Sequence, residues 1–354
     1  MGVLDREFLG MGDEVQQFEL ALSEFFRRPT VCVANGTSAL QLALEAIGVG
    51  IGDEVLVPSL TYVASFQAIS ATGAKPIACD VRSDTLIFDW RDAERRITKN
   101  TKAIMTVHYS GGVGNLHEIY LFAKRHSLRV IEDAAHAFGT VFQGRRIGSF
   151  GDIACFSFDG IKNITCGEGG CIVSDDEMIL QRIRDSRLLG VKGDTENRFS
   201  GKRSWEFEVT AQGWRYHMSN VMAAVGLEQL KRFPEMSAIR QSLAQEYDRL
   251  LGGHPRIQLI KHDYNSVVPH IYVVLIPGLA DRKILQENLS LRGIQTGVHY
   301  YPNHRLSFFK DSVTMPLSVT DGIFPTMITL PMHIELSKKE VSFICNELIK
   351  SIDI

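Results

Sequence analysis

A single lysine, Lys162, stands where a short apolar run meets a glycine-rich segment. The run 153–158 (Ile-Ala-Cys-Phe-Ser-Phe) is too short for a typical helix and indicates a buried strand that breaks at Asp159-Gly160. Three glycines follow the lysine within eight residues. An amine flanked by apolar groups loses solvation, so its pKa falls and it becomes a nucleophile able to form a Schiff base with an aldehyde. Alone, the same pattern also describes an exposed loop lysine beside a glycine turn.

An aspartate upstream of the lysine supplies a partner for such chemistry. The run Leu128-Arg-Val-Ile131 is a short strand, and Glu132-Asp133 stands at its carboxyl end, where ligands bind in open α/β sheets. Asp133 could hold a proton on the ring nitrogen of a pyridine, which makes pyridoxal phosphate (PLP) an electron sink. An ordinary N-cap for the residues from Ala134 onward is the alternative reading of this aspartate.

The segment Val31-Cys-Val-Ala-Asn-Gly-Thr-Ser38 describes a strand, a turn and the start of a helix. Thr37 and Ser38 place hydroxyl groups beside the unpaired amides of a helix N-terminus, which suits a phosphate. A plain Ser/Thr helix cap remains the alternative.

Seven motifs in order extend this pattern over nearly the whole chain. They are Asn35-Gly-Thr-Ser-Ala, Val57-Pro-Ser-Leu-Thr-Tyr-Val-Ala, Glu132-Asp-Ala-Ala-His-Ala, Ser157-Phe-x3-Lys-x2-Thr-x-Gly-Glu-Gly-Gly, Tyr216-x-Met-Ser-Asn, Val298-His-Tyr and Leu330-Pro-Met-His. In this order they resemble the PLP-dependent sugar nucleotide aminotransferases of the DegT/DnrJ/EryC1/StrS group. The resemblance implies a fold-type I, aspartate aminotransferase-like α/β fold, with a large mainly parallel sheet domain and a smaller C-terminal α+β domain.

The resemblance also assigns roles to individual residues. Lys162 and Asp133 would be catalytic, with PLP bound to Lys162 as a Schiff base and converted to pyridoxamine phosphate (PMP) in turnover. The cofactor would contact Thr37, Ser38, Tyr62, Asp133, His136, Ser157, Lys162 and Asn220, and the substrate would contact His108, Tyr109, His299 and Tyr300. Tyr62 would stack on the pyridine ring, and Asn220 would reach the cofactor phosphate of the neighbouring subunit in a homodimer with shared active sites. A core tyrosine and a structural histidine are the alternatives for Tyr62 and His299. No metal is implied.

The implied reaction moves an amino group from L-glutamate to a nucleotide-linked keto sugar. At His136 and the segment His108-Tyr-Ser-Gly111 the chain resembles members of the group that aminate C4, whereas C3 enzymes often carry glutamine and leucine there. The product would then be a 4-amino-4,6-dideoxyhexose, such as the glucose form, made from a dTDP-linked 4-keto-6-deoxyhexose for lipopolysaccharide O-antigen or antibiotic sugars. Amination at C3 remains open. A dehydratase of the same group would carry histidine in place of Lys162, and a non-catalytic PLP- or sugar-nucleotide-binding regulator would lack Lys162 or Asp133.

Composition agrees with a soluble enzyme. The chain has 354 residues, 45% of them hydrophobic, and a net charge of −3 with both signs interspersed, which gives no reason to expect nucleic acid or membrane binding. The six cysteines form no CxxC pair, so we expect reduced thiols in the cytoplasm rather than a disulfide framework or zinc site. The first residues carry no apolar signal segment.

Strand-like runs alternate with helical stretches through the first half of the chain. Seven strands are expected, at 31–34, 54–57, 76–79, 103–107, 129–132, 153–158 and 171–173, after an amphipathic helix at 13–27. A helix is expected up to Phe233, and Pro234 marks the boundary between a large PLP-binding domain, 1–233, and a small domain, 234–354. The small domain should hold strands near 256–260, 270–276 and 294–298 and a closing helix at 337–352.

Overall fold

A seven-stranded sheet forms the centre of the protein. The computed structural model describes residues 2–5, 8–202 and 205–352. The strand order is β1-β9-β8-β5-β4-β2-β3, and every neighbouring pair is parallel except the two that β9 makes. The strands are β1 (Thr30–Val33), β2 (Glu54–Pro58), β3 (Lys75–Cys79), β4 (Thr101–Val107), β5 (Arg129–Asp133), β8 (Ile153–Ser157) and β9 (Gly170–Val173). All seven expected strands are confirmed, and so is the mainly parallel sheet.

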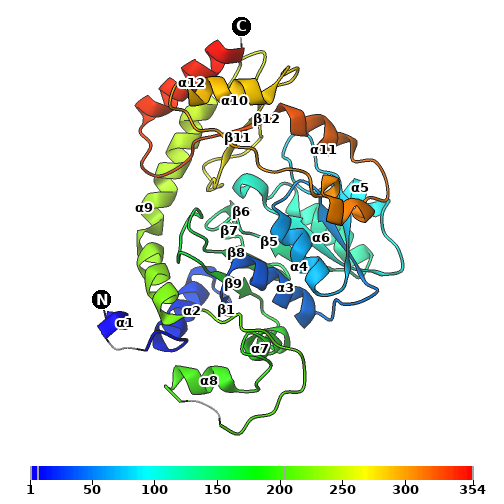
Figure 1. The fold of residues 1–354 in the computed structure, drawn as a ribbon, viewed down its shortest axis with the longest axis vertical. Coiled ribbons are helices and arrows are strands. Elements are labelled where there is room, and N and C mark those ends of the chain that lie inside the picture. The colour runs from blue at the N-terminus through cyan, green and yellow to red at the C-terminus, as the bar shows by residue number, and fades with distance from the viewer. Residues whose placement is uncertain (1, 6–7, 203–204, 353–354) are drawn as a thin grey trace.

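Both faces of this sheet are buried, which explains why its strands are apolar without a polar face. In β8, for example, Ala154 and Phe156 belong to one core cluster, while Ile153 and Cys155 belong to the cluster on the opposite face. The first face is covered by α2 (Asp13–Phe26), α6 (Leu116–Arg125) and α9 (Asn220–Leu251), and the second by α3 (Gly36–Ala46), α4 (Val63–Ala71) and α7 (Glu177–Ser186). Figure 1 shows the helices around the sheet in the lower part of the molecule.

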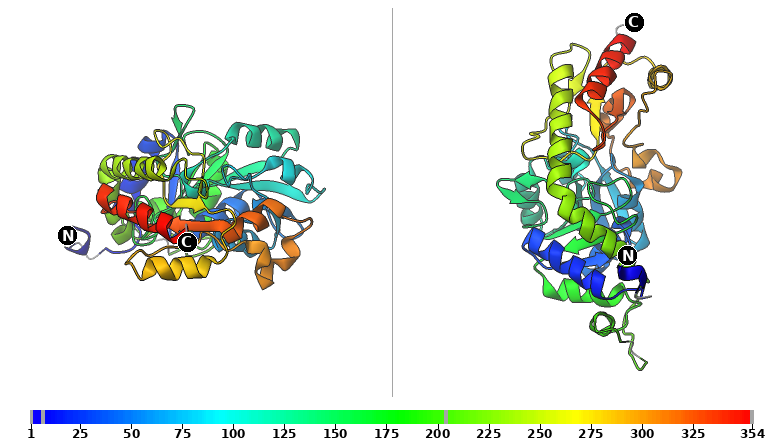
Figure 2. Two further views of the ribbon diagram at one scale, coloured as in Figure 1. Left: turned by 90° about the horizontal axis from the view of Figure 1, so that it is seen from above. Right: turned by 90° about the vertical axis from the view of Figure 1, so that its left-hand side faces the viewer.

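The long helix α9 connects the two parts of the chain (Figures 1 and 2). Its first half packs against α2 and its second half against α12 (Lys338–Ile352). Pro234 lies inside α9 and does not end it. A proline removes one helical hydrogen bond, but packing on both sides of it keeps the helix continuous. The boundary expected at Pro234 therefore falls within a single helix of 32 residues.

The C-terminal part is built on a small antiparallel sheet in the order β10-β11-β12. Its strands are β10 (Gln258–Leu259), β11 (Tyr272–Leu275) and β12 (Met327–Leu330). The strand expected near 294–298 is wrong, because this segment makes only an isolated bridge between Gly297 and Thr329. The third strand is instead β12.

The remaining elements are short connections. They are α1 (Gly2–Asp5), α5 (Trp90–Glu94), β6 (Val141–Phe142), β7 (Arg145–Arg146), α8 (Asp194–Phe199), α10 (Arg282–Ser290), α11 (Ser318–Ile323) and the 3-10 turns η1 (Tyr109–Gly111), η2 (Asn303–Arg305), η3 (Ser307–Ser312) and η4 (Phe324–Thr326). In the described part of the chain, no helix combines the length and the apolar character needed to cross a membrane.

Candidate active site

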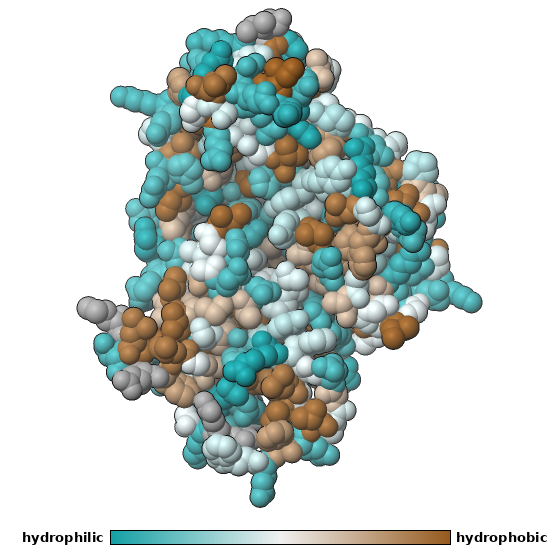
Figure 3. All heavy atoms as spheres, viewed as in Figure 1, coloured by the Kyte–Doolittle hydropathy of each residue, from teal (hydrophilic) through white to brown (hydrophobic). Residues whose placement is uncertain are grey.

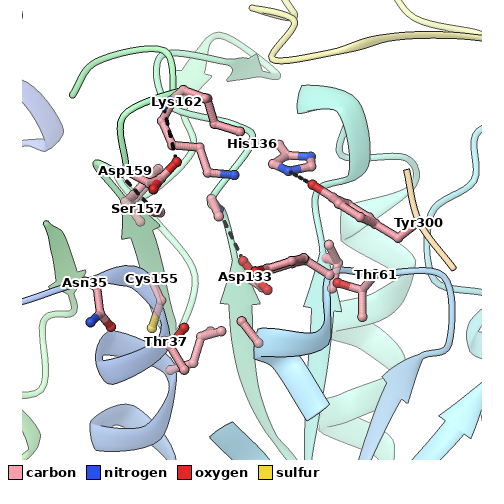
Figure 4. A pocket seen from close by; sticks show the side chains of 18 of the residues that line it. Asn35, Thr37, Thr61, Asp133, His136, Cys155, Ser157, Asp159, Lys162 and Tyr300 are labelled. Atoms are coloured by element: carbon pink, nitrogen blue, oxygen red, sulfur yellow. Dashed lines mark hydrogen bonds between the residues drawn. The ribbon is translucent and has the colours of Figure 1, made fainter. Parts of the chain in front are cut away.

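A cavity of about 430 Å³ opens where the carboxyl ends of β4, β5 and β8 meet the N-terminus of α3. Its size suits a small-molecule ligand. Eight of the residues expected in the site line it, namely Thr37, Tyr62, Asp133, His136, Ser157, Lys162, His299 and Tyr300. They come from both parts of the chain, and Figure 4 shows the Lys162 amine pointing into the space between Asp133 and the hydrogen-bonded pair of Tyr300 and His136. The carboxyl edge of the sheet thus gathers the predicted chemistry in one place.

Lys162 reaches into this cavity from the loop after β8. A turn in which the Lys162 N–H donates to the Asp159 carbonyl (3.0 Å) sets the direction of the side chain. Burial lowers the pKa of the Lys162 amine from its usual value, while Asp133 and Asp159 act in the opposite direction. A larger fraction of this amine is therefore uncharged near neutral pH than for an exposed lysine, which a nucleophile requires.

Asp133 stands at the carboxyl end of β5, on the floor of the cavity. Its Oδ2 accepts a hydrogen bond from the Ser65 hydroxyl (2.7 Å), and its Oδ1 accepts one from the Ala135 N–H (3.3 Å). Ser65 in turn contacts the Thr61 hydroxyl at 2.9 Å. Burial raises the pKa of the Asp133 carboxyl, whereas these hydrogen bonds favour its ionised form. The carboxylate is held in one orientation, suited to a protonated ring nitrogen.

The N-terminus of α3 forms an anion-binding end to the cavity. Asn35 and Ser38 close a capping box, with the Ser38 N–H donating to Asn35 Oδ1 at 2.8 Å and the Asn35 N–H donating to Ser38 Oγ at 3.2 Å. The Ser38 hydroxyl therefore serves the cap and does not line the cavity. Gly36 and Thr37, whose amides precede the first helical hydrogen bond, do line it, beside Ser157.

The close approach of α3 to the end of β8 depends on Gly36. A Cβ at this position would lie 2.8 Å from the Ser157 Cβ and 3.1 Å from its Oγ. We therefore expect Gly36→Ala to separate Thr37 from Ser157 and to raise the PLP dissociation constant about 10-fold or more, because overpacking of this kind costs about 1–3 kcal/mol. PLP titration followed by absorbance measures this directly.

Gly50→Ala is the matched control, because a Cβ there would meet only the Thr72 carbonyl at 3.8 Å. The Gly50→Ala protein should bind PLP as the wild type does. Equal PLP affinity for the Gly36→Ala protein and the wild type would show that this close approach does not form the phosphate site.

Aromatic and imidazole side chains form another wall of the cavity. The His136 Nδ1 accepts a hydrogen bond from the Ser110 N–H at 3.3 Å, and burial lowers the pKa of His136 well below its usual range. The neutral ring therefore carries its proton on Nε2, which donates to the Tyr300 hydroxyl at 2.9 Å. The proton of the Tyr300 hydroxyl is then free to donate to a ligand. Tyr62 is 58% exposed at the cavity mouth, with its ring centroid 5.5 Å from that of Tyr300.

Three other expected site residues lie outside the cavity. His108 is fully buried against Glu132, with 2.6 Å between His108 Nε2 and Glu132 Oε2. The Tyr109 hydroxyl donates to the His299 carbonyl beneath the wall of the cavity. Asn220 is buried at the start of α9, where its amide accepts from the Val15 N–H (3.4 Å) and donates to the Phe8 carbonyl (3.0 Å). Within one chain, His108 and Tyr109 support the wall and Asn220 anchors the N-terminal segment.

Two residues near the reacting groups were missed in the sequence. Ser65 donates a hydrogen bond to Asp133 and directly follows the motif that begins at Val57. Its hydroxyl in the first turn of α4 is a signal from which this contact could have been predicted. His270 lies 3.4 Å from the Lys162 Nζ through its Nε2. It precedes β11 by two residues, and nothing in the sequence pattern relates it to Lys162.

The residues of the cavity fit PLP. One buried amine with a lowered pKa, one oriented carboxylate and one helix N-terminus match the aldehyde, the ring nitrogen and the phosphate of this cofactor, in that order. Bound there, PLP supplies an electron sink for deprotonation at the carbon that bears the amino group of the donor.

Known proteins agree with this assignment. A model of the DegT/DnrJ/EryC1/StrS aminotransferase family matches residues 1–349. Spr1654 from Streptococcus pneumoniae, solved in PLP and PMP forms, is 29% identical and superposes in its PMP form with a TM-score of 0.92, over 99% of this chain and 95% of that chain. Helicobacter pylori PseC, an aminotransferase involved in the biosynthesis of pseudoaminic acid, is 28% identical over 99% of this chain and 94% of its own, with a TM-score of 0.91.

A further similar structure is S. venezuelae DesV in complex with a ketimine intermediate. It is 31% identical over 98% of this chain and 91% of its own, with a TM-score of 0.89. The likeness in every case spans both the large sheet and the C-terminal part. The chain therefore belongs to the DegT/DnrJ/EryC1/StrS aminotransferase family and is an aminotransferase that works with pyridoxal phosphate.

Proposed function

We propose that this aminotransferase transfers the amino group of L-glutamate to C4 of a dTDP-linked 4-keto-6-deoxyhexose. The product is a 4-amino-4,6-dideoxyhexose for a surface polysaccharide such as O-antigen, or for an antibiotic sugar. The observation that carries the reaction class is the meeting of Lys162 and Asp133 in one cavity with an anion-binding helix end. A sugar as acceptor is supported by Spr1654, which bears the name of a sugar aminotransferase.

The residues of the cavity divide the reaction between them. The amine of Lys162 would serve as the base that moves a proton from the α-carbon of the donor, and such a positioned base contributes about 10²–10⁴-fold. Asp133 would keep the ring nitrogen of the cofactor protonated, and Gly36, Thr37 and Ser157 would hold its phosphate. Tyr300, oriented by His136, donates its proton toward the ligand. The donor leaves as a keto acid before the sugar binds, as in other ping-pong reactions.

The choice of C4 rests on His136 and the segment 108–111. His136 orients a hydroxyl donor in the cavity, whereas His108 and Tyr109 act from behind its wall. The test is to aminate the cofactor with glutamate, add TDP-4-keto-6-deoxyglucose, follow the cofactor absorbance and locate the new amine by NMR. Return of the PLP spectrum with nitrogen at C4 supports the proposal. A response only to the 3-keto isomer would replace C4 by C3 and keep the reaction class. Failure of every amino donor to change the spectrum would favour a binding protein.

We further propose a homodimer with shared active sites, working in the cytoplasm. Figure 3 shows apolar side chains gathered on the surface beside the N-terminal segment and the start of α9. Large apolar side chains exposed on these elements are Leu4, Phe8, Leu9, Val221 and Val225. Such a patch indicates an interface, and Asn220 lies directly beneath it. The six cysteines are free and buried, in keeping with a reducing compartment.

Light scattering tests the dimer. The expected mass is twice the 39.5 kDa of one chain, and Val221→Glu with Val225→Glu should reduce it toward one chain and weaken PLP binding. A wild-type protein that remains a single chain at micromolar concentration while fully active would exclude shared sites.

A further inference from the structure

A histidine of the C-terminal part lies against Lys162 without lining the cavity. The His270 Nε2 is 3.4 Å from the Lys162 Nζ, while His270 itself does not line the cavity and is 4% exposed. Its ring centroid lies 4.4 Å from that of His136. A ligand in the cavity would thus touch Lys162 but not His270. Any effect of this imidazole on the reaction must pass through the lysine.

The backbone that carries His270 is fixed from two sides. The Arg240 guanidinium, buried in α9, donates to the carbonyls of Pro269 (3.4 Å) and His270 (3.3 Å). The Ser110 hydroxyl, from the large sheet domain, donates to the Ile271 carbonyl at 2.7 Å. The imidazole therefore has a defined position relative to Lys162, although the two residues come from different parts of the fold.

The direction of the contact follows from the protonation of the ring. Burial, and the charge of Lys162, lower the pKa of His270 well below its usual range, so the ring is neutral. The His270 Nδ1 has no hydrogen-bond partner in the part of the chain that the structure describes. A lysine ammonium has only donors, so beside the charged form of Lys162 a neutral His270 carries its proton on Nδ1 and accepts through Nε2.

We propose that His270 is a positioning residue for Lys162. The His270 Nε2 accepts a hydrogen bond from the Lys162 amine whenever that amine is not bonded to the cofactor. In these states the amine acts as the base of the reaction, and the contact holds it beside the cavity rather than letting it swing toward solvent. The inference rests on Lys162 as the cofactor-bearing residue of the proposed function. His270 thus contributes to the reaction from the C-terminal part of the chain, although it does not touch the substrate.

Several other ionisable groups interact with the charge of Lys162, and a test of His270 must leave these residues unsubstituted. The carboxyls of Asp133 and Asp159 favour the ammonium form of Lys162, and its charge in turn acts on the rings of His136 and His299. A change at His270 leaves Asp133, Asp159 and His299 in place, but it also removes a ring that packs on His136 and lowers the pKa of His136, so His136 must be followed in the same variants. A hydrogen bond to the ammonium stabilises that form, so its loss should lower the pKa of the lysine.

The variant His270→Leu removes the acceptor and keeps an apolar side chain of similar size, while His270→Gln restores an acceptor oxygen. In the cofactor-free full-length protein, the pH dependence of Lys162 acetylation by acetic anhydride, read by mass spectrometry, gives the pKa of its amine. We expect the midpoint to fall by about one unit or more in His270→Leu, since a hydrogen bond to a charged group is worth about that much. We expect His270→Gln to regain most of the shift.

The same variants should separate in the half-reaction with glutamate. His270→Leu is expected to slow the conversion of the PLP form to the PMP form about 10-fold or more, because a misplaced base costs rate at proton transfer. Deuterium at Cα of glutamate should then give a larger isotope effect, with an unchanged KM for glutamate.

His262→Leu is the control, because His262 is a second histidine of the same segment whose ring packs on Gly112 instead of Lys162. The His262→Leu variant should leave the midpoint of the pH dependence of Lys162 acetylation unchanged. The proposal is overturned if His270→Leu and the wild type share one midpoint, or if the Leu and Gln variants behave alike. Failure to find PLP on Lys162 would instead overturn the proposed function, so the two outcomes are distinguishable.

Discussion

Replacing Lys162 with alanine is expected to abolish transamination, lowering kcat/KM for the sugar substrate by more than about 10⁴-fold. The variant loses both the covalent attachment of PLP and the base that moves the proton, and the base alone is worth about 10²–10⁴-fold. The cavity keeps its other polar groups, so PLP should still bind, but with the absorbance of a free aldehyde. Steady-state kinetics and an absorbance spectrum of the loaded protein measure both effects.

Lys124→Ala is the matched control, because Lys124 is an exposed lysine on α6, away from the cavity. It should retain full activity and the wild-type spectrum. Small primary amines such as ethylamine should partly restore activity to the Lys162→Ala protein, since they can supply a base to the emptied space. An active Lys162→Ala enzyme without added amine would remove this residue from the reaction.

Replacing Asp133 with asparagine is expected to lower kcat about 10²–10³-fold, as loss of a preorganised charge at a reacting centre does. The two side chains have nearly the same shape, but a neutral amide cannot stabilise a protonated ring nitrogen, so the cofactor loses its capacity as an electron sink. Ser65→Ala should give a smaller loss, about 10-fold, because the carboxylate remains but loses the hydrogen bond that orients its Oδ2. Single-turnover conversion of the PLP form by glutamate reports these rates.

Ser70→Ala, at the other end of the same helix as Ser65, serves as the control and should leave the rate unchanged. The order of rates should be wild type, then Ser65→Ala, then Asp133→Asn. A rate for Asp133→Asn within a factor of three of the wild type would mean that the ring nitrogen is protonated by another group.

Most of the large domain could be predicted from the sequence because its strands are buried on both faces. A strand that is buried along its whole length and mostly apolar, such as Ile153–Ser157, leaves a clear signal, and parallel topology then places the residues at its carboxyl end beside those of its neighbours. Lys162 and Asp133 were predicted for this reason, each standing at or just beyond the end of a strand. Family resemblance added Tyr62, His136 and Tyr300, which all line the cavity.

The parts of the fold and site that were not predicted depend on contacts between segments far apart in the sequence. The spacing of residues along the chain does not indicate such contacts. Ser65 faces Asp133 because α4 packs beside the end of β5, and His270 meets Lys162 because two separate carbonyl clamps fix its backbone. His108 was expected to contact the substrate, but its pairing with Glu132 holds the ring in the core. The strand Met327–Leu330 was not predicted, and the segment 294–298 makes only the isolated bridge from Gly297 to Thr329.

Asn220 has one role within its own chain and a second, expected role in a dimer. Its amide is occupied by Val15 and Phe8 of its own chain, so contact with the cofactor phosphate of a partner subunit remains a prediction about the assembled dimer. Pro234 likewise follows the pattern of a boundary, yet it lies within α9 because helices α2 and α12 pack against the two halves.

Reduction of the PLP-loaded protein with borohydride, followed by mapping of the modified peptide by mass spectrometry, identifies the residue that bears the cofactor. Borohydride converts a Schiff base into a stable secondary amine, so the cofactor mass stays on the residue that held it. We expect a pyridoxyl phosphate group on Lys162 alone, and we expect it to be absent when the protein is treated with glutamate before reduction. Modification of a different lysine, or a Lys162 adduct that glutamate does not remove, would contradict this expectation.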